Sequence, residues 1–206
     1  MFPSVPPVTW ALILANTVIY ILQLGAGVGL IKYFALWPLG ASPALAPELV
    51  GTFQPWQLVT YSFLHGSFTH LFLNMLALFM FGSGIERLFG PRRYVQYYFA
   101  AVLAAALTQI VVSTATGSFY PTVGASGGVF GLLLAYGIYF PRRTIVLLFP
   151  PIPMPAWLFV IVYAAIELYL GVTGTQAGVA HFAHLGGMLG GFLMLRYWRR
   201  RPQLRE

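Results

Sequence analysis

The stretch Pro121–Gly131 reads PTVGASGGVFG and places Ser126 among small residues, shortly before an apolar run, Val129–Phe140. A helix from Ser126 to the arginines that follow Phe140 covers roughly 21 Å at about 1.5 Å per residue. A full crossing needs about 20 residues, so Ser126 is expected to begin a helix inside the membrane, below one surface. Irregular backbone at that depth is stable only where protein or a water-filled cavity surrounds it. A polar residue at the N-terminus of such a helix, inside the membrane, indicates a site of chemical reaction.

The composition indicates a polytopic membrane protein. The 206 residues are 59% hydrophobic and 7% charged, with a mean hydropathy of +0.79. These values exclude an ordinary soluble domain. The absence of cysteine excludes thiol catalysis and disulfides. The net charge of +7 comes from arginines beside apolar segments, so it predicts membrane topology rather than nucleic-acid binding.

Six apolar segments predict an all-α bundle of six membrane spans with a short, central fourth helix, in a single membrane domain over residues 1–206. The expected spans are about 8–28, 68–89, 94–114, 126–140, 156–170 and 179–198. The connection 29–64 is interpreted as an interfacial loop with short helices, and its Trp37 and Trp56 suit the headgroup level. Gly171–Gly178 is interpreted as a glycine-rich turn.

The basic residues predict the orientation. With the N-terminus inside, only Lys32 of the 11 basic residues falls on the outer side. The positive-inside rule therefore predicts that both termini are cytoplasmic, in an integral, multi-pass protein of a prokaryotic inner (plasma) membrane.

Polar residues inside the spans are costly in lipid, so each is a functional hypothesis. The candidates are His70, Asn74, Ser126, Glu167, His181 and His184. The distance to the inner arginines is roughly 20 Å from Asn74 and roughly 18 Å from His184, close to the value for Ser126. Three residues from three spans thus lie at one height, and His70 lies one turn above Asn74. The common height of these residues predicts that they form one functional site.

The residue types restrict the chemistry of that site. The chain has no aspartate and its glutamates are scattered, which argues against a carboxylate pair and an aspartate-oriented triad. The spacing of His181 and His184 resembles metal ligands, but the His-Glu-x-x-His pattern is missing, so no metal and no cofactor are expected.

A serine with a histidine base remains. Ser126 lies where helix N–H groups point at a developing oxyanion. His184 is placed to take the serine proton, and His70 and Asn74 to donate hydrogen bonds to the oxyanion.

At these residues the chain resembles the rhomboid intramembrane serine proteases. The family's Gly-x-Ser-Gly element matches Gly124–Gly127, and its Ala-His-x-x-Gly element matches Ala183–Gly187. Its second-span pattern of two histidines and an asparagine matches His65, His70 and Asn74, and the Glu86-Arg87 pair that follows also fits.

The resemblance implies a Ser-His dyad of Ser126 and His184, with an oxyanion hole of His70, Asn74 and the Ser126 amide. Gly124, Gly127 and Phe130 would support the site. The chain departs from the family at Gln57, where arginine is frequent, and at Phe130, where a tyrosine often stacks on the histidine.

Simpler structural roles are open to the same residues. Small-xxx-small patterns in the fourth and sixth spans predict close helix packing, which would also bring Ser126 to His184. Four further polar residues are interpreted as structural: His65, Glu86, Glu167 and His181. Two other functions are open to the chain: a non-catalytic member of the same fold, and a small transporter or channel, which would need repeats or a polar path across the bilayer.

The sequence thus predicts an enzyme, a serine endopeptidase that hydrolyses peptide bonds in or near transmembrane segments of other proteins. Its expected partners are transmembrane protein substrates and the lipid bilayer, with no nucleic acid and no metal.

Overall fold

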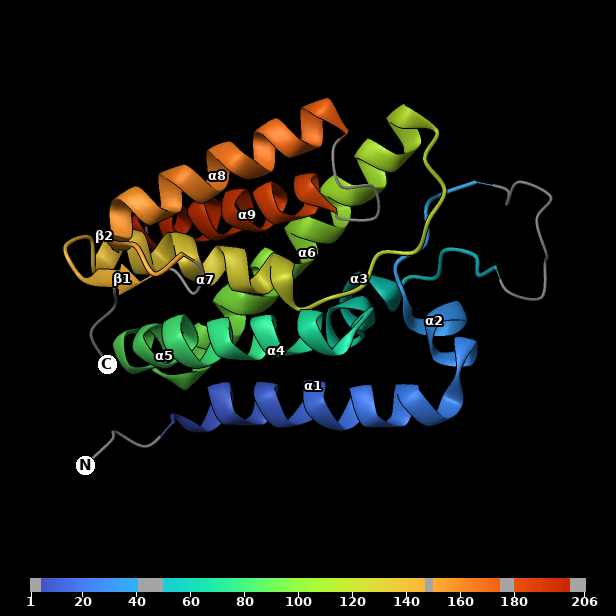
Figure 1. The fold of residues 1–206 in the computed structure, drawn as a ribbon, viewed down its shortest axis with the longest axis horizontal. Helices are drawn as coiled ribbons and strands as arrows, with labels where there is room; N and C mark the ends of the chain where they lie inside the picture. Colours follow the sequence, from blue (N-terminus) through green and yellow to red (C-terminus); the bar gives the residue numbers. More distant parts are fainter. Residues whose placement is uncertain (1–4, 41–49, 147–149, 175–179, 201–206) are drawn as a thin grey trace.

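The computed structural model is a bundle of helices, most of which run side by side (Figure 1). It describes residues 5–40, 50–146, 150–174 and 180–200. The elements in this part are α1 (Pro7–Ala26), α2 (Val28–Phe34), α3 (Gln57–Thr60), the 3₁₀ helix η1 (Tyr61–Phe63), α4 (Phe68–Ala77), the π-helical segment η2 (Leu78–Gly82), α5 (Ser83–Phe89), α6 (Pro91–Thr116), α7 (Ser126–Tyr139), β1 (Thr144–Val146), β2 (Pro153–Pro155), α8 (Ala156–Thr173) and α9 (His181–Arg200).

The helix lengths confirm the predicted all-α membrane bundle. Four helical stretches of the described residues are long and apolar enough to cross a bilayer: Pro7–Ala26, Phe68–Phe89, Pro91–Thr116 and Ala156–Thr173. The apolar helix α7 is shorter, as expected of the fourth span. The sixth expected span is α9, with 20 residues and two arginines in its last turn.

Several local features differ from the expectations. A two-stranded antiparallel hairpin, β1 with β2, fills the proline-rich connection before α8. The second span contains the π segment η2, which the sequence did not predict. Trp56 is half exposed, but Trp37 is buried and donates its indole N–H to the carbonyl oxygens of Ile31 and Lys32. The predicted interfacial loop and glycine-rich turn lie partly outside the described residues, since 41–49 and 175–179 are not included.

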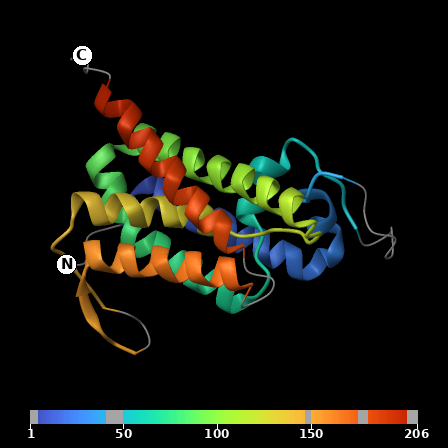
Figure 2. The ribbon, with the colours of Figure 1, turned by 90° about the horizontal axis from the view of Figure 1, so that it is seen from above.

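Helix α7 lies in the middle of the bundle, between α6, α8 and α9 (Figures 1 and 2). It is apolar on every side, and nine of its residues are buried: Gly127, Gly128, Val129, Phe130, Gly131, Leu132, Leu133, Ala135 and Gly137. A helix that is hydrophobic all round has no face suited to water, so its sequence favours this central position.

Glycines bring α7 and α9 into backbone contact. A Cβ atom on Gly187 would collide with the Gly127 carbonyl oxygen, and one on Gly131 would lie 3.2 Å from the Gly187 carbonyl oxygen. One turn on, a Cβ on Gly191 would lie 3.3 Å from the Gly131 Cα. Small residues allow such an approach between membrane helices, and dispersion contacts then hold it. The predicted packing of the fourth and sixth spans through glycine is therefore present.

The chain that enters α7 is held at two points, by Leu36 and by Tyr61 of η1. Leu36 and Thr122 exchange backbone hydrogen bonds of 3.0 and 2.9 Å, and the Gly124 N–H donates to the Tyr61 carbonyl oxygen at 3.0 Å. The Tyr61 hydroxyl donates in turn to the Val102 carbonyl oxygen of α6 at 2.8 Å. Gly124 has a φ of 128°, a conformation that side chains rarely adopt. These contacts set where α7 begins.

Glu86 joins the second span to the first. Its carboxylate is buried and accepts hydrogen bonds from the N–H groups of Val8 and Thr9, at 2.9 and 2.7 Å, and from the Thr9 hydroxyl at 2.7 Å. Helix N-termini carry unpaired N–H groups and a partial positive charge, so a carboxylate stabilises them. Glu86 therefore has a structural role, as predicted, and this role is to cap α1.

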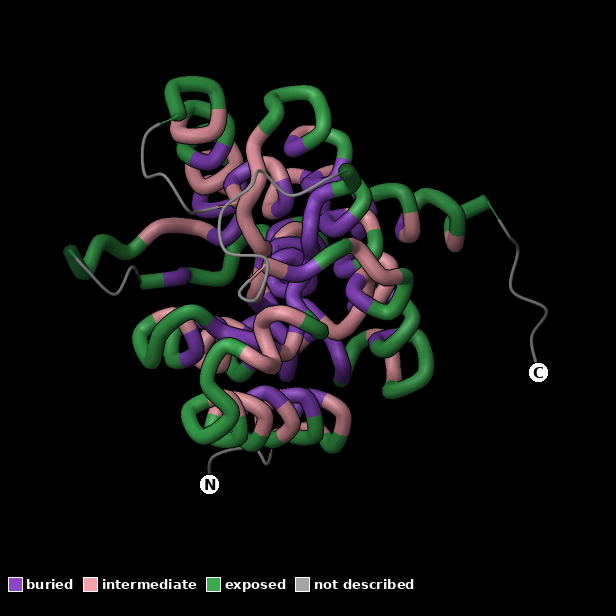
Figure 3. Tube along the Cα trace, turned by 90° about the vertical axis from the view of Figure 1, so that its right-hand side faces the viewer, coloured by how far each residue is buried: buried purple, intermediate pink, exposed green. Residues whose placement is uncertain are grey.

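The outside of the bundle is apolar. Buried residues lie at its centre and exposed ones around it (Figure 3). Large exposed side chains include Leu14, Ile21, Ile161 and Ile166, which lie on α1 and α8. An apolar exterior over spans of this length is suited to lipid.

The α7–α9 contact predicts a stability effect. Gly187→Ala is expected to lower the stability in detergent by about 1–3 kcal/mol, because the new methyl group must separate the two backbones. The measurement is Tm, followed by tryptophan fluorescence.

Gly25→Ala is the matched control, because Gly25 lies in α1 and a methyl group added there would meet no other atom within 4 Å. That variant is expected to match or slightly exceed the wild-type Tm, since alanine favours helix. An equal Tm for Gly187→Ala and the wild type would contradict the close-packing account.

Candidate active site

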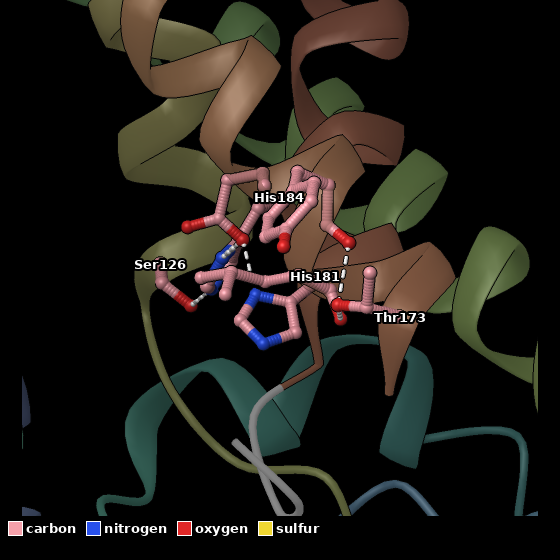
Figure 4. Close-up of polar contacts among 7 residues, drawn as sticks. Ser126, Thr173, His181 and His184 are labelled. Carbon is pink, nitrogen blue, oxygen red and sulfur yellow. Dashed lines mark hydrogen bonds and ion pairs between the residues drawn. The ribbon is translucent and has the colours of Figure 1, made fainter. Parts of the chain in front are cut away.

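The structure places Ser126 and His184 in direct contact. Ser126 is the first residue of α7 and His184 lies in the first turn of α9. Their side chains face each other, with a distance of 2.8 Å between Ser126 Oγ and His184 Nε2 (Figure 4). This length is that of a normal hydrogen bond. The α7–α9 glycine contact lies directly next to this pair, at Gly127 and Gly187.

Phe130 determines the plane of the His184 ring. The two rings are stacked, with centroids 4.3 Å apart and an interplanar angle of 3°. Phe130 lies one turn after Ser126 on α7, so one helix supplies both the hydroxyl and the surface behind the imidazole. The aromatic stacking that the resemblance implied is present without the tyrosine hydroxyl.

A carboxylate lies behind the histidine, where the sequence predicted only a structural residue. Glu167 of α8 has its Oε2 atom 2.9 Å from His184 Nδ1 and 2.7 Å from His181 Nδ1. Glu167 and His181 are both buried. Ser126, His184 and Glu167 therefore form one continuous hydrogen-bonded chain. The available signal was the position of Glu167 inside an apolar span, where an ionisable group needs a partner.

His70 and Asn74 lie across from this chain on α4. A Cβ on Gly124 would lie 2.8 Å from His70 Nε2 and 3.5 Å from Ser126 Oγ, so the His70 ring edge and the hydroxyl share the space over Gly124. The Gly66 N–H points at His70 Nδ1 at 3.4 Å, which leaves the Nε2 proton directed toward Gly124. The Asn74 amide donates to the His70 carbonyl oxygen at 2.9 Å. Its second amide proton is not used by that bond.

A cavity of about 700 Å³ opens over these groups. Its walls come from α4 on one side and α8 on the other, with α7 between them. The lining residues include Ser126, His184, His70, Asn74, Tyr163 and Glu167. Most of the remaining lining is apolar, as at Leu73, Met80, Leu133 and Phe159. The volume is in the range of a ligand pocket.

Glu167, His181 and His184 are also the residues that could hold a metal. Their ligand atoms all lie within 4.8 Å of one another. A metal there would replace the two hydrogen bonds to Glu167 and would occupy Nδ1 of His184. The expectation that this protein uses no metal stays a prediction.

His65 and Gln57 support the loop before α4. The backbone of His65 exchanges hydrogen bonds with the Gln23 side chain, and its ring lies edge-on to His70 with centroids 5.0 Å apart. Burial, and secondly the nearby His70, lower the pKa of His65 to about 3, so this ring is uncharged at neutral pH.

Gln57 uses both ends of its buried amide. It accepts from the N–H groups of Trp37 and Gln54 and donates to the carbonyl oxygens of Tyr33 and Thr52, at distances of 3.1–3.2 Å. An arginine has no acceptor and could not make the first two bonds. Gln57 therefore holds this loop through hydrogen bonds that an arginine at the same position could not all make.

The fold and the site together define a helical membrane protein with a serine and a histidine paired at the end of a short central helix. A family model of the rhomboid domain matches residues 52–201. The chain belongs to the rhomboid family, and membership supports intramembrane protease activity in general.

Curated relatives agree with this assignment. Rhomboid protein 1, mitochondrial, of Saccharomyces cerevisiae is 28% identical over 94% of this chain and 56% of its own length. Presenilin-associated rhomboid-like protein A, mitochondrial, of Danio rerio is 30% identical over 85% of this chain and 44% of its own length. Rhomboid protease GluP of Bacillus subtilis is 29% identical over 70% of this chain and 26% of its own length. The chain thus spans about half or less of these relatives.

The comparisons also bear on location. The helices indicate a multi-pass membrane protein. Two of the three relatives above are named as mitochondrial, so the comparisons do not support the expected prokaryotic inner membrane.

The hydrogen bonds of Gln57 predict its importance for the loop. Gln57→Ala is expected to lower the stability by about 1–3 kcal/mol, because buried N–H and C=O groups lose their partners. The measurement is Tm in detergent. Gln54→Ala is the control, since that side chain makes one exposed contact of 3.5 Å to Thr52. Equal Tm values for the two variants would contradict this role.

Proposed function

We propose that this chain is an intramembrane serine protease that cleaves peptide bonds in or near the transmembrane segments of other membrane proteins. The observation that carries the proposal is the 2.8 Å contact between Ser126 Oγ and His184 Nε2 inside a bundle of membrane helices. Membership of the rhomboid family supports the same reaction class.

The reaction follows from the roles of these two atoms. Ser126 Oγ attacks the scissile carbonyl carbon while His184 Nε2 takes the hydroxyl proton. His184 then gives this proton to the leaving amine nitrogen, the peptide C–N bond breaks, and an acyl ester on Ser126 remains. A water molecule attacks the ester and passes a proton to His184. The ester C–O bond breaks, and His184 returns the proton to Ser126 Oγ.

The developing oxyanion would lie at the N-terminus of α7. The first N–H groups of a helix have no partner within it, so the Ser126 amide is available as a donor. His70 and Asn74 of α4 would complete the oxyanion hole from the opposite wall of the cavity. Gly124 leaves room there, since a side chain at this position would meet the His70 ring.

The cavity suggests how a substrate reaches Ser126. Its apolar lining between α4 and α8 suits a segment that arrives from lipid. A regular helix hides its carbonyl groups in hydrogen bonds, so substrates with glycine or proline near the cut should unwind more easily. We also propose that the described helices act as one membrane domain, because Glu86 binds α1 to the second span.

The alternative function is a membrane protein that binds clients without cutting them. The intact Ser126–His184 contact favours the enzyme over this alternative. The Ser126–His184 contact lies at one end of α7. This does not favour a transporter or channel, which would need a polar path across the whole bilayer.

The proposed function predicts labelling by a fluorophosphonate probe. The wild type in detergent is expected to react covalently with the probe, while Ser126→Ala and His184→Ala are expected to lose labelling, because one lacks the nucleophile and the other the base. Labelling is read by in-gel fluorescence after confirming that each variant keeps its Tm.

Two outcomes would count against the proposal. Labelling that persists in Ser126→Ala would place the reactive group elsewhere. A wild type that neither reacts nor cleaves a membrane substrate in liposomes would favour the non-catalytic alternative.

The oxyanion hole is tested separately at His70. His70→Ala is expected to lower kcat by about 10²- to 10³-fold, because one donor to the transition state is lost. KM should change little, since the oxyanion forms only during reaction. The measurement is steady-state cleavage of a membrane substrate.

Phe72→Ala is the control on the same helix, because Phe72 is half exposed on the outside of the bundle. Wild-type kcat in His70→Ala would remove His70 from the oxyanion hole.

A further inference from the structure

Two histidines direct the same ring atom at one carboxylate oxygen. His184 Nδ1 and His181 Nδ1 lie 2.9 and 2.7 Å from Oε2 of Glu167. Serine–histidine chemistry by itself requires neither the carboxylate nor the second histidine. Placing a carboxylate in an apolar span is costly, so its position here needs a reason.

The carboxylate determines which nitrogen of His184 carries the proton. An ionised carboxylate only accepts hydrogen bonds, so the Nδ1 atom that faces it must be the donor. In a neutral imidazole the other nitrogen, Nε2, then keeps its lone pair. That lone pair faces Ser126 Oγ at 2.8 Å, as a general base must.

The negative charge of Glu167 also stabilises His184 when His184 is protonated. His184 becomes an imidazolium during each proton transfer, in surroundings with little water. The side chains of His184 and Glu167 are 12% and 10% exposed. A negative charge at hydrogen-bond distance stabilises this cation more strongly there than it would in water.

His181 holds the carboxylate in place. It is the first residue of α9, one turn before His184, and donates to the same Oε2 atom. Its Nε2 is buried and makes no hydrogen bond within the described residues. Two donors from one helix thus fix the rotamer of Glu167 on the neighbouring helix α8.

We propose that Glu167 is a positioning residue that completes a Ser126–His184–Glu167 chain, with His181 as the residue that orients Glu167. The inference rests on the proposed protease function and assigns that site a third member. Glu167 orients His184, selects its Nδ1-protonated form and stabilises the imidazolium, but does not touch the substrate.

The test compares Glu167→Gln with the wild type as the full chain in detergent, with a cleavable membrane substrate and EDTA present. Glutamine keeps the size and can accept from His184, but it removes the charge. It is expected to lower kcat by roughly 10²-fold, within the range that positioned acid–base groups supply. KM is expected to stay near the wild-type value, because Glu167 acts through His184.

The pH profile separates charge from structure. Glu167→Gln removes the negative charge at hydrogen-bond distance from His184. The acidic limb of kcat/KM is therefore expected to move to lower pH. Among the described residues, the titratable groups around the cavity also include His181 on α9, Tyr163 on α8 and His70 on α4, and the variant leaves all three in place. Glu167→Asp, which restores the charge, is expected to return the limb toward the wild-type position.

Glu86→Gln is the matched control. It removes another buried carboxylate, at the start of α1 and away from the cavity. Glu86→Gln is expected to lower Tm, but the acidic limb of its kcat/KM profile should lie at the same pH as in the wild type.

The outcomes distinguish this inference from the proposed function. If the wild type cleaves and Ser126→Ala does not, the function stands whatever Glu167 does. Wild-type kcat in Glu167→Gln would then overturn the inference alone, and so would a reduced kcat with an unshifted acidic limb, which is the pattern of structural damage. If Ser126→Ala retains full cleavage, it is the function that fails.

Discussion

The backbone contact between α7 and α9 is the constraint on which the site depends. The serine comes from one helix and the histidine from the other, and neither side chain is long. They reach hydrogen-bond distance because Gly127, Gly131 and Gly187 leave no side chains between the two backbones. In lipid there is no hydrophobic gain when two apolar helices associate. The contact between α7 and α9 must therefore be stabilised by close van der Waals packing of the two backbones. The backbone hydrogen bonds of Thr122 with Leu36 and of Gly124 with Tyr61 then determine where α7 begins.

A second constraint is that polar groups in this bundle need partners. Glu86, Gln57 and Glu167 are all buried, and each is satisfied by several donors or acceptors. The first two tie α1 and the first loop to the rest of the bundle. Glu167 differs, because its partners are the histidine that contacts Ser126 and a second histidine beside it. The need of buried polar groups for hydrogen-bond partners thus stabilises the fold at Glu86 and Gln57. At Glu167 the same need places a carboxylate beside the histidine of the proposed active site.

Much of this arrangement could be predicted from the sequence. Apolar lengths predicted the spans, and the distances to the inner arginines placed Ser126, Asn74 and His184 at one height, because helix rise is nearly constant. Glu167 was missed as a site residue because its contact depends on how α8 is rotated against α9, which periodicity alone does not determine. The absence of aspartate also argued against an aspartate-oriented triad, and Glu167 was interpreted as structural. The β1–β2 hairpin was missed because prolines signal only that regular helix ends.

The position of Glu167 has a consequence for substrate entry. Helix α8 forms one wall of the cavity and also carries the carboxylate that binds His184. If a substrate that enters between α4 and α8 moved α8 outward, Glu167 and His184 would separate and would no longer meet the distance and angle that a hydrogen bond requires. Ser126 and His184 lie on α7 and α9, and Phe130 still stacks on His184, so the two side chains would stay close, but His184 would lose the carboxylate that orients it. An open entrance would therefore leave the nucleophile paired with its base but without the charge behind it. Full activity would return only when α8 packs against α9 again, with the substrate already inside.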